Sequence, residues 1–268
     1  MATAATRNAG APSGAQVCRA RLNLLGGFSV IVDGESWDVP DSSKRLLVFL
    51  ALQERPQRRP VVAGTLWPDK TDTRAAANLR SSLWRLPEPS GLPLVSAAGP
   101  SLQLSEHLNV DVRVVEATGW ALIRDPRAFV DDVDPALFLL ELLPGWYEDW
   151  VVFERERLAH LQLHFLEALT HVLIQRERTA EALDVALRLV KVDPLREGSQ
   201  RALLAVHWAE HNIGEAHRQF KTYQLLIRRT FGCEPSASLR AMFPAELLSG
   251  SSDRSQPLLD DREHLAGS

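Results

Sequence analysis

The feature that constrains the fold most is a run of long amphipathic segments that fills the chain after residue 112. Breakers such as Pro126, Pro135, Asp193-Pro194 and Pro235 separate these segments. Helices joined by short connections pack antiparallel against their neighbours, so this half is predicted to be all-helical. Apolar residues recur at helical spacing over roughly 113–124, 150–176, 178–191, 196–211, 213–230 and 236–247.

A repeat is visible within this helical half. The dipeptide Glu181-Ala182 recurs 34 residues later as Glu215-Ala216. This period is that of tetratricopeptide-type helix pairs, and small residues at these points let neighbouring helices approach closely. The sequence therefore predicts a tetratricopeptide-like all-α domain over residues 110–247.

Residues 20–109 begin with a strand pattern. Apolar residues alternate with period two around Leu22–Leu24 and Phe28–Val32, and again at Trp37 and Val39. Asp33-Gly34 lies between the last two stretches, and both positions of this dipeptide tolerate positive φ. A small antiparallel sheet is therefore expected here.

Three helices and a hairpin are expected after this sheet. Side-chain oxygens of Asp41, Ser42 and Ser43 are candidate N-caps for the first helix. Arg55–Pro60 is predicted to be a loop, and the second and third helices are predicted over Val61–Trp67 and Arg74–Leu86. Two short apolar runs, Leu94-Val95 and Leu102–Leu104, predict a terminal hairpin. This order predicts a mainly α protein, with an N-terminal winged helix-turn-helix of a small antiparallel sheet and three helices before the all-α domain.

The two ends of the chain differ from these domains. Residues 1–19 and 248–268 contain few large apolar side chains, so we expect disordered tails. The N-terminal stretch lacks the apolar run of a signal peptide, and about 18 consecutive apolar residues occur nowhere. The expected location is therefore the cytoplasm. Cys18 and Cys233 are the only cysteines, and both are expected to be unpaired.

Charge is distributed unevenly along the chain. Residues 1–110 carry a net charge of +3, residues 111–247 carry −5, and the last 21 residues carry −2. A mildly basic first domain is compatible with nucleic acid, and an acidic second domain with a different partner.

The third predicted helix carries the strongest candidate site. Ala75, Leu79, Ser82, Leu83 and Leu86 fall on one face at about 100° per residue. The opposite side is polar, cationic and aromatic, which suits the major groove: Arg pairs with guanine, Asn pairs with adenine, and Trp packs on sugar or a thymine methyl. The alternative is an ordinary solvated helix face. The predicted DNA-binding residues of this helix are Arg74, Asn78, Arg80, Ser81, Trp84 and Arg85.

Further cations surround the first predicted helix and the loop after it. Lys44, Arg45, Arg58 and Arg59 are predicted to contact DNA phosphates, releasing counterions. Taken singly, such residues are as often plain surface charge.

The chain resembles a known family in both halves. RLNLLGGFSVIVDGESWDVPDSSKRLLVFLAL, TLWPD and AAANLRSSLWRLPE resemble the response-regulator-type winged helix of the Streptomyces antibiotic regulatory protein (SARP) family. LLPGWYEDWVVFERERLAHLQLHFLEAL, AEALDVALRLVKVDPLREGSQRALLAVH and FGCEPSASLRAMF resemble its bacterial transcriptional activation domain (BTAD).

The resemblance implies a transcriptional activator that recruits RNA polymerase. Its partners would be double-stranded DNA at direct-repeat promoter sites, RNA polymerase and its sigma subunit, with protomers associating on DNA. Larger relatives append a P-loop domain, but no G-x-x-x-x-G-K-[ST] stretch occurs here. A short form without cofactor or membrane partner is expected.

Three other interpretations stay open. His207, Glu210 and His211 spell H-x-x-E-H, a pattern that some zinc peptidases use, but we expect no catalytic or metal site because the motif is short.

Four aromatic residues are expected to wedge a repeat helix against its neighbour rather than to bind a partner: Trp146, Tyr147, Trp150 and Phe153. The predicted wing, 94–105, contains no Lys or Arg, which favours an alternative: a protein-binding adaptor whose winged helix no longer binds DNA.

Overall fold

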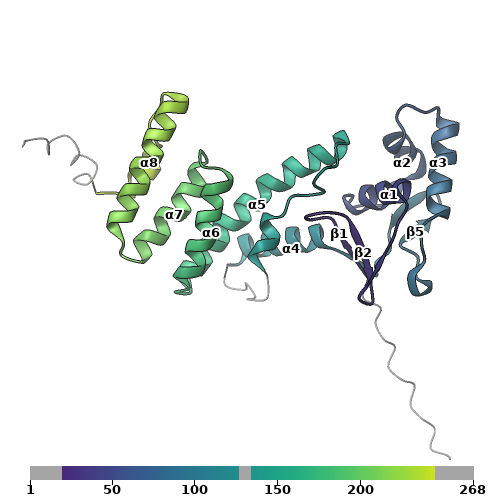
Figure 1. Cartoon of the computed structure of the whole chain (residues 1–268), viewed down its shortest axis with the longest axis horizontal. Coiled ribbons are helices and arrows are strands. Elements are labelled where there is room, and N and C mark those ends of the chain that lie inside the picture. Colours follow the sequence, from purple (N-terminus) through teal and green to yellow (C-terminus); the bar gives the residue numbers. More distant parts are fainter. Residues whose placement is uncertain (1–19, 127–133, 245–268) are drawn as a thin grey trace, which may run out of the picture. The chain divides into compact units, whose positions relative to one another are not determined.

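The computed structural model describes residues 20–126 and 134–244. The described residues divide into two compact units: 20–120 and 136–161 form the first unit, and 121–126, 134–135 and 162–244 form the second (Figure 1). The tails predicted over residues 1–19 and 248–268 lie outside the described residues. Within the described ranges, no helix is both long enough and apolar enough to cross a bilayer.

A four-stranded sheet opens the first unit, in the order β3-β2-β1-β7. The first three strands pair antiparallel as predicted, and Asp33 and Gly34 adopt φ of 50° and 90° at the turn. The fourth strand was not predicted; it pairs parallel to β1, with Val110 opposite Leu22. The strands are β1 (Ala20–Asn23), β2 (Ser29–Val32), β3 (Glu35–Trp37) and β7 (Leu108–Val110).

Three helices follow β3 in the chain and pack against one another, as the winged-helix prediction requires. They are α1 (Asp41–Ala51), α2 (Arg59–Leu66) and α3 (Asp72–Trp84). Their inner faces supply fully buried side chains such as Leu46, Val62 and Leu79, and this apolar burial stabilises the unit. The predicted capping of α1 by its own side chains is wrong, because Pro40 is the N-cap residue and no side-chain cap is present.

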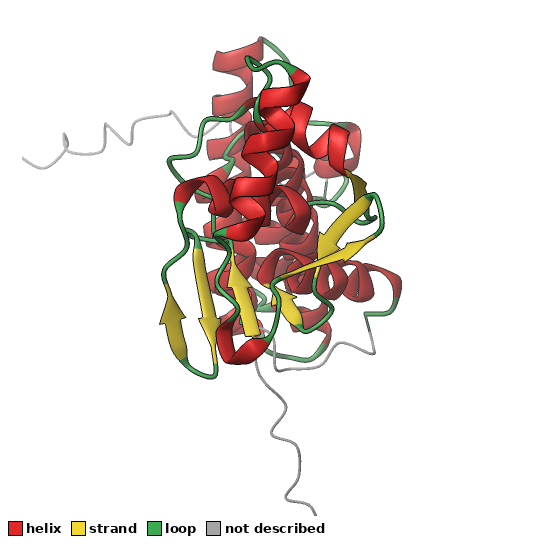
Figure 2. Ribbon diagram, turned by 90° about the vertical axis from the view of Figure 1, so that its right-hand side faces the viewer, coloured by secondary structure: helices red, strands yellow, loops and turns green. Residues whose placement is uncertain are grey.

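A second, three-stranded sheet forms the wing, in the order β4-β6-β5. The hairpin of β5 (Val95–Ala98) and β6 (Ser101–Leu104) confirms the prediction. The loop predicted over Arg55–Pro60 is partly wrong, because Gln57–Arg58 forms strand β4. Two residues are too few to show a strand periodicity, and β4 exists because β6 offers it an edge. Figure 2 shows the strands of both sheets in yellow.

Part of the helical half belongs to the first unit. This part comprises most of α4 (Asp111–Arg124), the short helix η2 (Pro135–Leu139) and the start of α5 (Asp149–Gln175). Trp146 stacks on Phe28 with ring centroids 6.3 Å apart, and Trp150 meets Phe49 edge-on at 5.5 Å. These two tryptophans therefore do not wedge repeat helices as predicted; they pack on the loop before β2 and on α1.

The second unit consists of helix pairs with the predicted 34-residue period. Its helices after α5 are α6 (Thr179–Val192), α7 (Glu197–Ala209), α8 (Ile213–Phe231) and the single turn α9 (Ala237–Arg240). The backbone repeats as well, because Glu177 and His211, 34 residues apart, both adopt positive φ of 60° and 56°. Ala182 and Ala216 are both fully buried. The tetratricopeptide-like fold is confirmed, whereas the long last helix predicted over 236–247 is wrong within the described residues.

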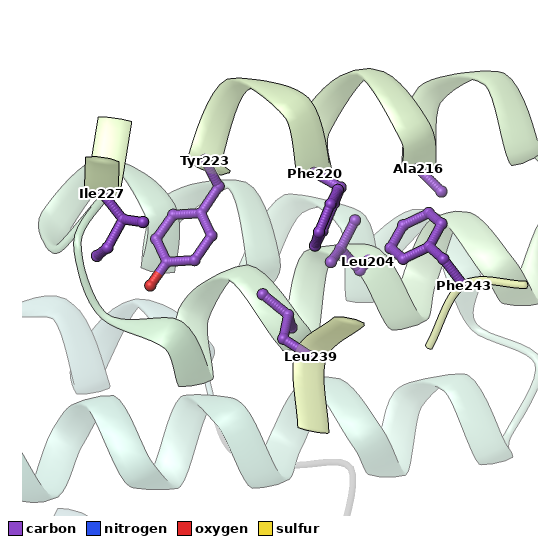
Figure 3. Close-up of a cluster of buried hydrophobic side chains, with 7 residues drawn as sticks. All are labelled: Leu204, Ala216, Phe220, Tyr223, Ile227, Leu239 and Phe243. Atoms are coloured by element: carbon purple, nitrogen blue, oxygen red, sulfur yellow. The ribbon is translucent and has the colours of Figure 1, made fainter. Parts of the chain in front are cut away.

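One apolar cluster holds the end of the second unit together (Figure 3). Phe220 of α8 and Phe243, which follows α9, have ring centroids 4.8 Å apart. Tyr223 is buried in the same cluster, and its hydroxyl donates to the carbonyl oxygen of Leu195 at 3.2 Å. The cluster explains why a chain segment with only one turn of helix stays packed against α8. Its members are Leu204, Ala216, Phe220, Tyr223, Ile227, Leu239 and Phe243.

Candidate nucleic-acid interface

Helix α3 has one buried face and one exposed face. Ala75, Leu79 and Ser82 are buried, as predicted for the inner side. Trp84 is 85% exposed, which is unusual for a large aromatic side chain. Asn78 is half-buried, and the remaining predicted contact residues are exposed: Arg74, Arg80, Ser81 and Arg85. The structure thus places all six predicted residues of this helix outside its packed face.

A hydrogen bond between helices fixes the end of α3. The Ser43 hydroxyl of α1 donates to the main-chain carbonyl oxygen of Ser82 at 2.8 Å, and both residues are buried. The last carbonyls of a helix have no partner within it, so this bond satisfies one that would otherwise be orphaned. The sequence pattern did not indicate this role, because Ser43 was expected to cap its own helix.

The structure brings two of the predicted cations together at a groove. Arg59, at the start of α2, and Arg80, in α3, both line a groove of about 500 Å³ between these helices. The rest of its lining is small or apolar apart from Asp72. Gly64 of α2 also lines the groove, and nothing in the pattern of α2 singled it out.

Arg58 lies on the wing sheet. It occupies β4, opposite Ser101 of the hairpin, and its side chain is exposed. The next residue is also bonded to the wing hairpin, because the Arg59 main-chain N–H donates to the Pro100 carbonyl oxygen at 2.9 Å. The wing hairpin lacks Lys and Arg of its own, but the strand paired with it supplies a cation. Recognising this from sequence would have required predicting β4.

Lys44 and Arg45 lie at a different place. The Lys44 Nζ atom lies 3.0 Å from an Asp41 carboxylate oxygen, and the Arg45 Nε atom lies 3.0 Å from a Glu148 carboxylate oxygen. Both line a separate pocket of about 380 Å³ that includes the exposed ring of Tyr147. A cation that is already paired with a carboxylate gains less binding free energy from a DNA phosphate. Lys44 and Arg45 are therefore weaker candidates for DNA contact than the arginines of α3.

The half-buried Asp111 carboxylate anchors the start of α4 to the first sheet. It accepts hydrogen bonds from the N–H groups of Leu24 and Leu25 at 2.9 Å and of Val112 at 2.8 Å. Burial raises the pKa of Asp111 above its ordinary value, although these N–H groups act to lower it. Its partners are main-chain donors at a helix start, so we assign this group to structure.

The H-x-x-E-H pattern does not form a helical pair of ligands. Helix α7 ends at Ala209, and His211 lies beyond it with φ of 56°. His207 and His211 therefore do not stand one helical turn apart on a common face, as the zinc peptidase arrangement requires. Among the described residues, no three His, Cys, Asp or Glu side chains gather in a way that could hold a metal ion.

Comparison with known proteins finds a matching domain family and a solved structure of similar fold. Residues 125–247 match the family described as bacterial transcriptional activator domain. The structure of Mycobacterium tuberculosis EmbR in complex with a low-affinity phosphopeptide is similar over 90% of this chain, with a TM-score of 0.65 and 19% identity.

The chain spans 66% of the EmbR chain in that structure. No curated protein matches the chain in sequence. At 19% identity, the likeness to EmbR concerns the fold. Residues 125–247 thus match the bacterial transcriptional activator domain family, and the chain joins this segment to an N-terminal winged helix in a fold similar to that of EmbR.

Proposed function

We propose that the chain is a sequence-specific DNA-binding transcriptional activator. The observation that carries the proposal is the exposed side of α3, where Trp84 and the guanidinium-bearing Arg80 and Arg85 lie away from the core. An exposed tryptophan between arginines is costly in water and useful in a DNA groove. In helix-turn-helix proteins the second helix of the motif reads base edges, and α3 holds that position after α2.

The remaining cations have a supporting role in this proposal. Arg58 on the wing sheet and Arg59 at the start of α2 contact phosphates and set the orientation of α3. Arg74, Asn78 and Ser81 contact bases or sugar along the same face. Lys44 and Arg45 contribute only where a phosphate competes with their carboxylate partners. No metal or cofactor takes part, and the protein acts in the cytoplasm.

Activation follows from bridging DNA and polymerase. We propose that protomers bind direct-repeat promoter sites side by side and that the chain contacts RNA polymerase and its sigma subunit. A contact that adds about 1.4 kcal/mol raises promoter occupancy tenfold. No catalysed reaction is needed for this function.

The test begins with selection of bound duplexes from random DNA by the full chain. Fluorescence anisotropy then measures the affinity of Arg80→Ala and Arg85→Ala for the selected duplex. We expect each variant to lose about 1–3 kcal/mol and to relax base preference at one position. Arg229→Ala, which removes an exposed cation from α8, is the matched control and should bind as the parent does. Unchanged affinity in both α3 variants would refute the proposed orientation of α3.

The wing hairpin supports a second candidate function. It carries neither Lys nor Arg between 94 and 105, so a protein-binding adaptor with a degenerate winged helix is the alternative. The adaptor would bind the selected duplex no better than unrelated DNA at any salt concentration. A salt-dependent, sequence-dependent mobility shift would exclude it.

A further inference from the structure

We infer that the groove between α2 and α3 binds a small amphipathic anion, an apolar molecule that carries one carboxylate, and that this ligand competes with DNA for Arg80. The binding site itself is independent of the proposed function. The competition rests on it, because it requires α3 to bind DNA.

The size and lining of the groove suit an apolar molecule. Its volume of about 500 Å³ lies within the range of about 300–1,000 Å³ that is usual for small-molecule sites. Most of its lining side chains offer van der Waals contact but no hydrogen bond, so an aliphatic or aromatic body fits them better than a sugar or a phosphate does. These side chains are Pro60, Ala63, Ala75, Ala76 and Leu79.

Two arginines give the groove its preference for an anion. Arg59 and Arg80 line it from opposite helices, and neither guanidinium has a hydrogen bond or ion pair with the residues that the structure describes. Asp72 is the one carboxylate in the lining, so the charged side chains sum to +1. A guanidinium binds a carboxylate through two parallel N–H donors, and these donors are unused here.

Gly64 keeps the groove open. It is an exposed residue inside α2, and a Cβ atom built on it would meet nothing within 4 Å. Glycine inside a helix costs about 1 kcal/mol relative to alanine. Packing does not require glycine at this position, since a side chain would find free space. The consequence of having glycine is a wider groove, and a larger residue here would fill it.

Arg80 belongs both to this groove and to the proposed DNA-binding face. A carboxylate bound to its guanidinium occupies the donors that a phosphate or a guanine would use. The ligand therefore lowers the affinity for DNA, and DNA lowers the affinity for the ligand by the same factor. The groove would make the activator responsive to an amphipathic acid.

The first experiment measures binding of 2-naphthoate to the full chain by calorimetry, beside 2-naphthamide, which has nearly the same shape without the charge. We expect the carboxylate to bind at least tenfold more tightly than the amide. Gly64→Leu should weaken naphthoate binding at least tenfold by filling the groove, and Arg59→Ala about tenfold by removing one donor set. Arg74→Ala, an α3 variant outside the groove, should bind naphthoate normally.

Several outcomes overturn the site. The proposed site is wrong if the chain does not bind naphthoate, or if it binds 2-naphthoate and 2-naphthamide equally tightly. It is also wrong if Gly64→Leu and Arg59→Ala both bind naphthoate as tightly as the parent does. Arg59→Ala keeps the test decisive if circular dichroism shows that Gly64→Leu misfolds.

The second experiment titrates naphthoate into a complex with the selected duplex. Release of DNA supports the competition, and an unchanged complex at saturating naphthoate overturns it. If the chain binds naphthoate but no duplex, the proposed function fails while the binding site stands. The two proposals therefore fail in different ways.

Discussion

The Ser43 hydroxyl and the Ser82 carbonyl oxygen, 2.8 Å apart, join α1 to the last turn of α3 in the buried interior of the first unit. Ser43→Ala removes the donor and leaves a buried carbonyl without a partner. We expect a loss of about 1–3 kcal/mol in the free energy of unfolding, measured by urea denaturation. Ser42→Ala, one residue earlier in α1 and only half-buried, should cost less than about 0.5 kcal/mol. Equal effects in the two variants would contradict the role given to this bond.

Gly198, the second residue of α7, lies against an ion pair. A Cβ atom at this position would overlap the Glu167 carboxylate, whose Oε1 atom lies 2.6 Å from Arg196 Nε. Gly198→Ala must displace Glu167 and break this charged hydrogen bond, so we expect a loss of about 1–3 kcal/mol of stability in thermal or urea unfolding.

The control is Gly214→Ala, at the second position of α8, where a Cβ atom meets nothing within 4 Å. Alanine is the better helix former, so this variant should be neutral or more stable by up to about 1 kcal/mol. A destabilised Gly214→Ala, or a neutral Gly198→Ala, would show that the contact with Glu167 does not decide the cost.

The Glu197 carboxyl should make the stability of the second unit depend on pH. Burial acts to raise its pKa, but hydrogen bonds from the Ser236 hydroxyl and N–H, together with Arg201, outweigh it and hold the pKa of Glu197 below its ordinary 4.5. A carboxyl with a depressed folded-state pKa contributes stability that is present above the unfolded pKa and lost as pH falls through the folded value.

Glu197→Gln should therefore be less stable than the parent at pH 6, and the difference should shrink as pH falls below 4.5. Urea midpoints of the two proteins between pH 6 and pH 3 measure this. A difference that stays constant across this range would mean that Glu197 stabilises through packing alone. Thr179→Ala, far from Glu197 along the chain, serves as a pH-independent reference.

Local patterns predicted the elements that are long or strongly periodic. The alternation around Leu22 and Val30 and the turn at Asp33-Gly34 predicted the first hairpin. The 34-residue spacing of Ala182 and Ala216 predicted the helix repeat, because both positions must be small where helices cross. The inner face of α3 followed from its 100° periodicity.

Elements that depend on partners far away in the chain were missed. β4 and β7 are too short to carry a pattern, and each exists because a neighbouring strand offers an edge. The tryptophans at 146 and 150 have helical spacing, but the spacing does not show which aromatic ring they meet. For the candidate site, the sequence predicted the residues of α3 but neither the groove at Gly64 nor the ion pair that engages Arg45. These are pairings in space, which single-sequence periodicity does not encode.

The salt dependence of DNA binding tests most directly whether the first unit binds DNA as proposed. The logarithm of the affinity for the selected duplex is measured against the logarithm of salt concentration for the parent, for the double variant Arg58→Ala with Arg59→Ala, which removes the proposed phosphate contacts, and for the control Arg229→Ala. We predict a steep parent slope, lowered by about 1 for each phosphate contact that the double variant loses, and an unchanged slope in the control. A parent chain with no measurable attraction to duplex DNA at low salt would contradict the account.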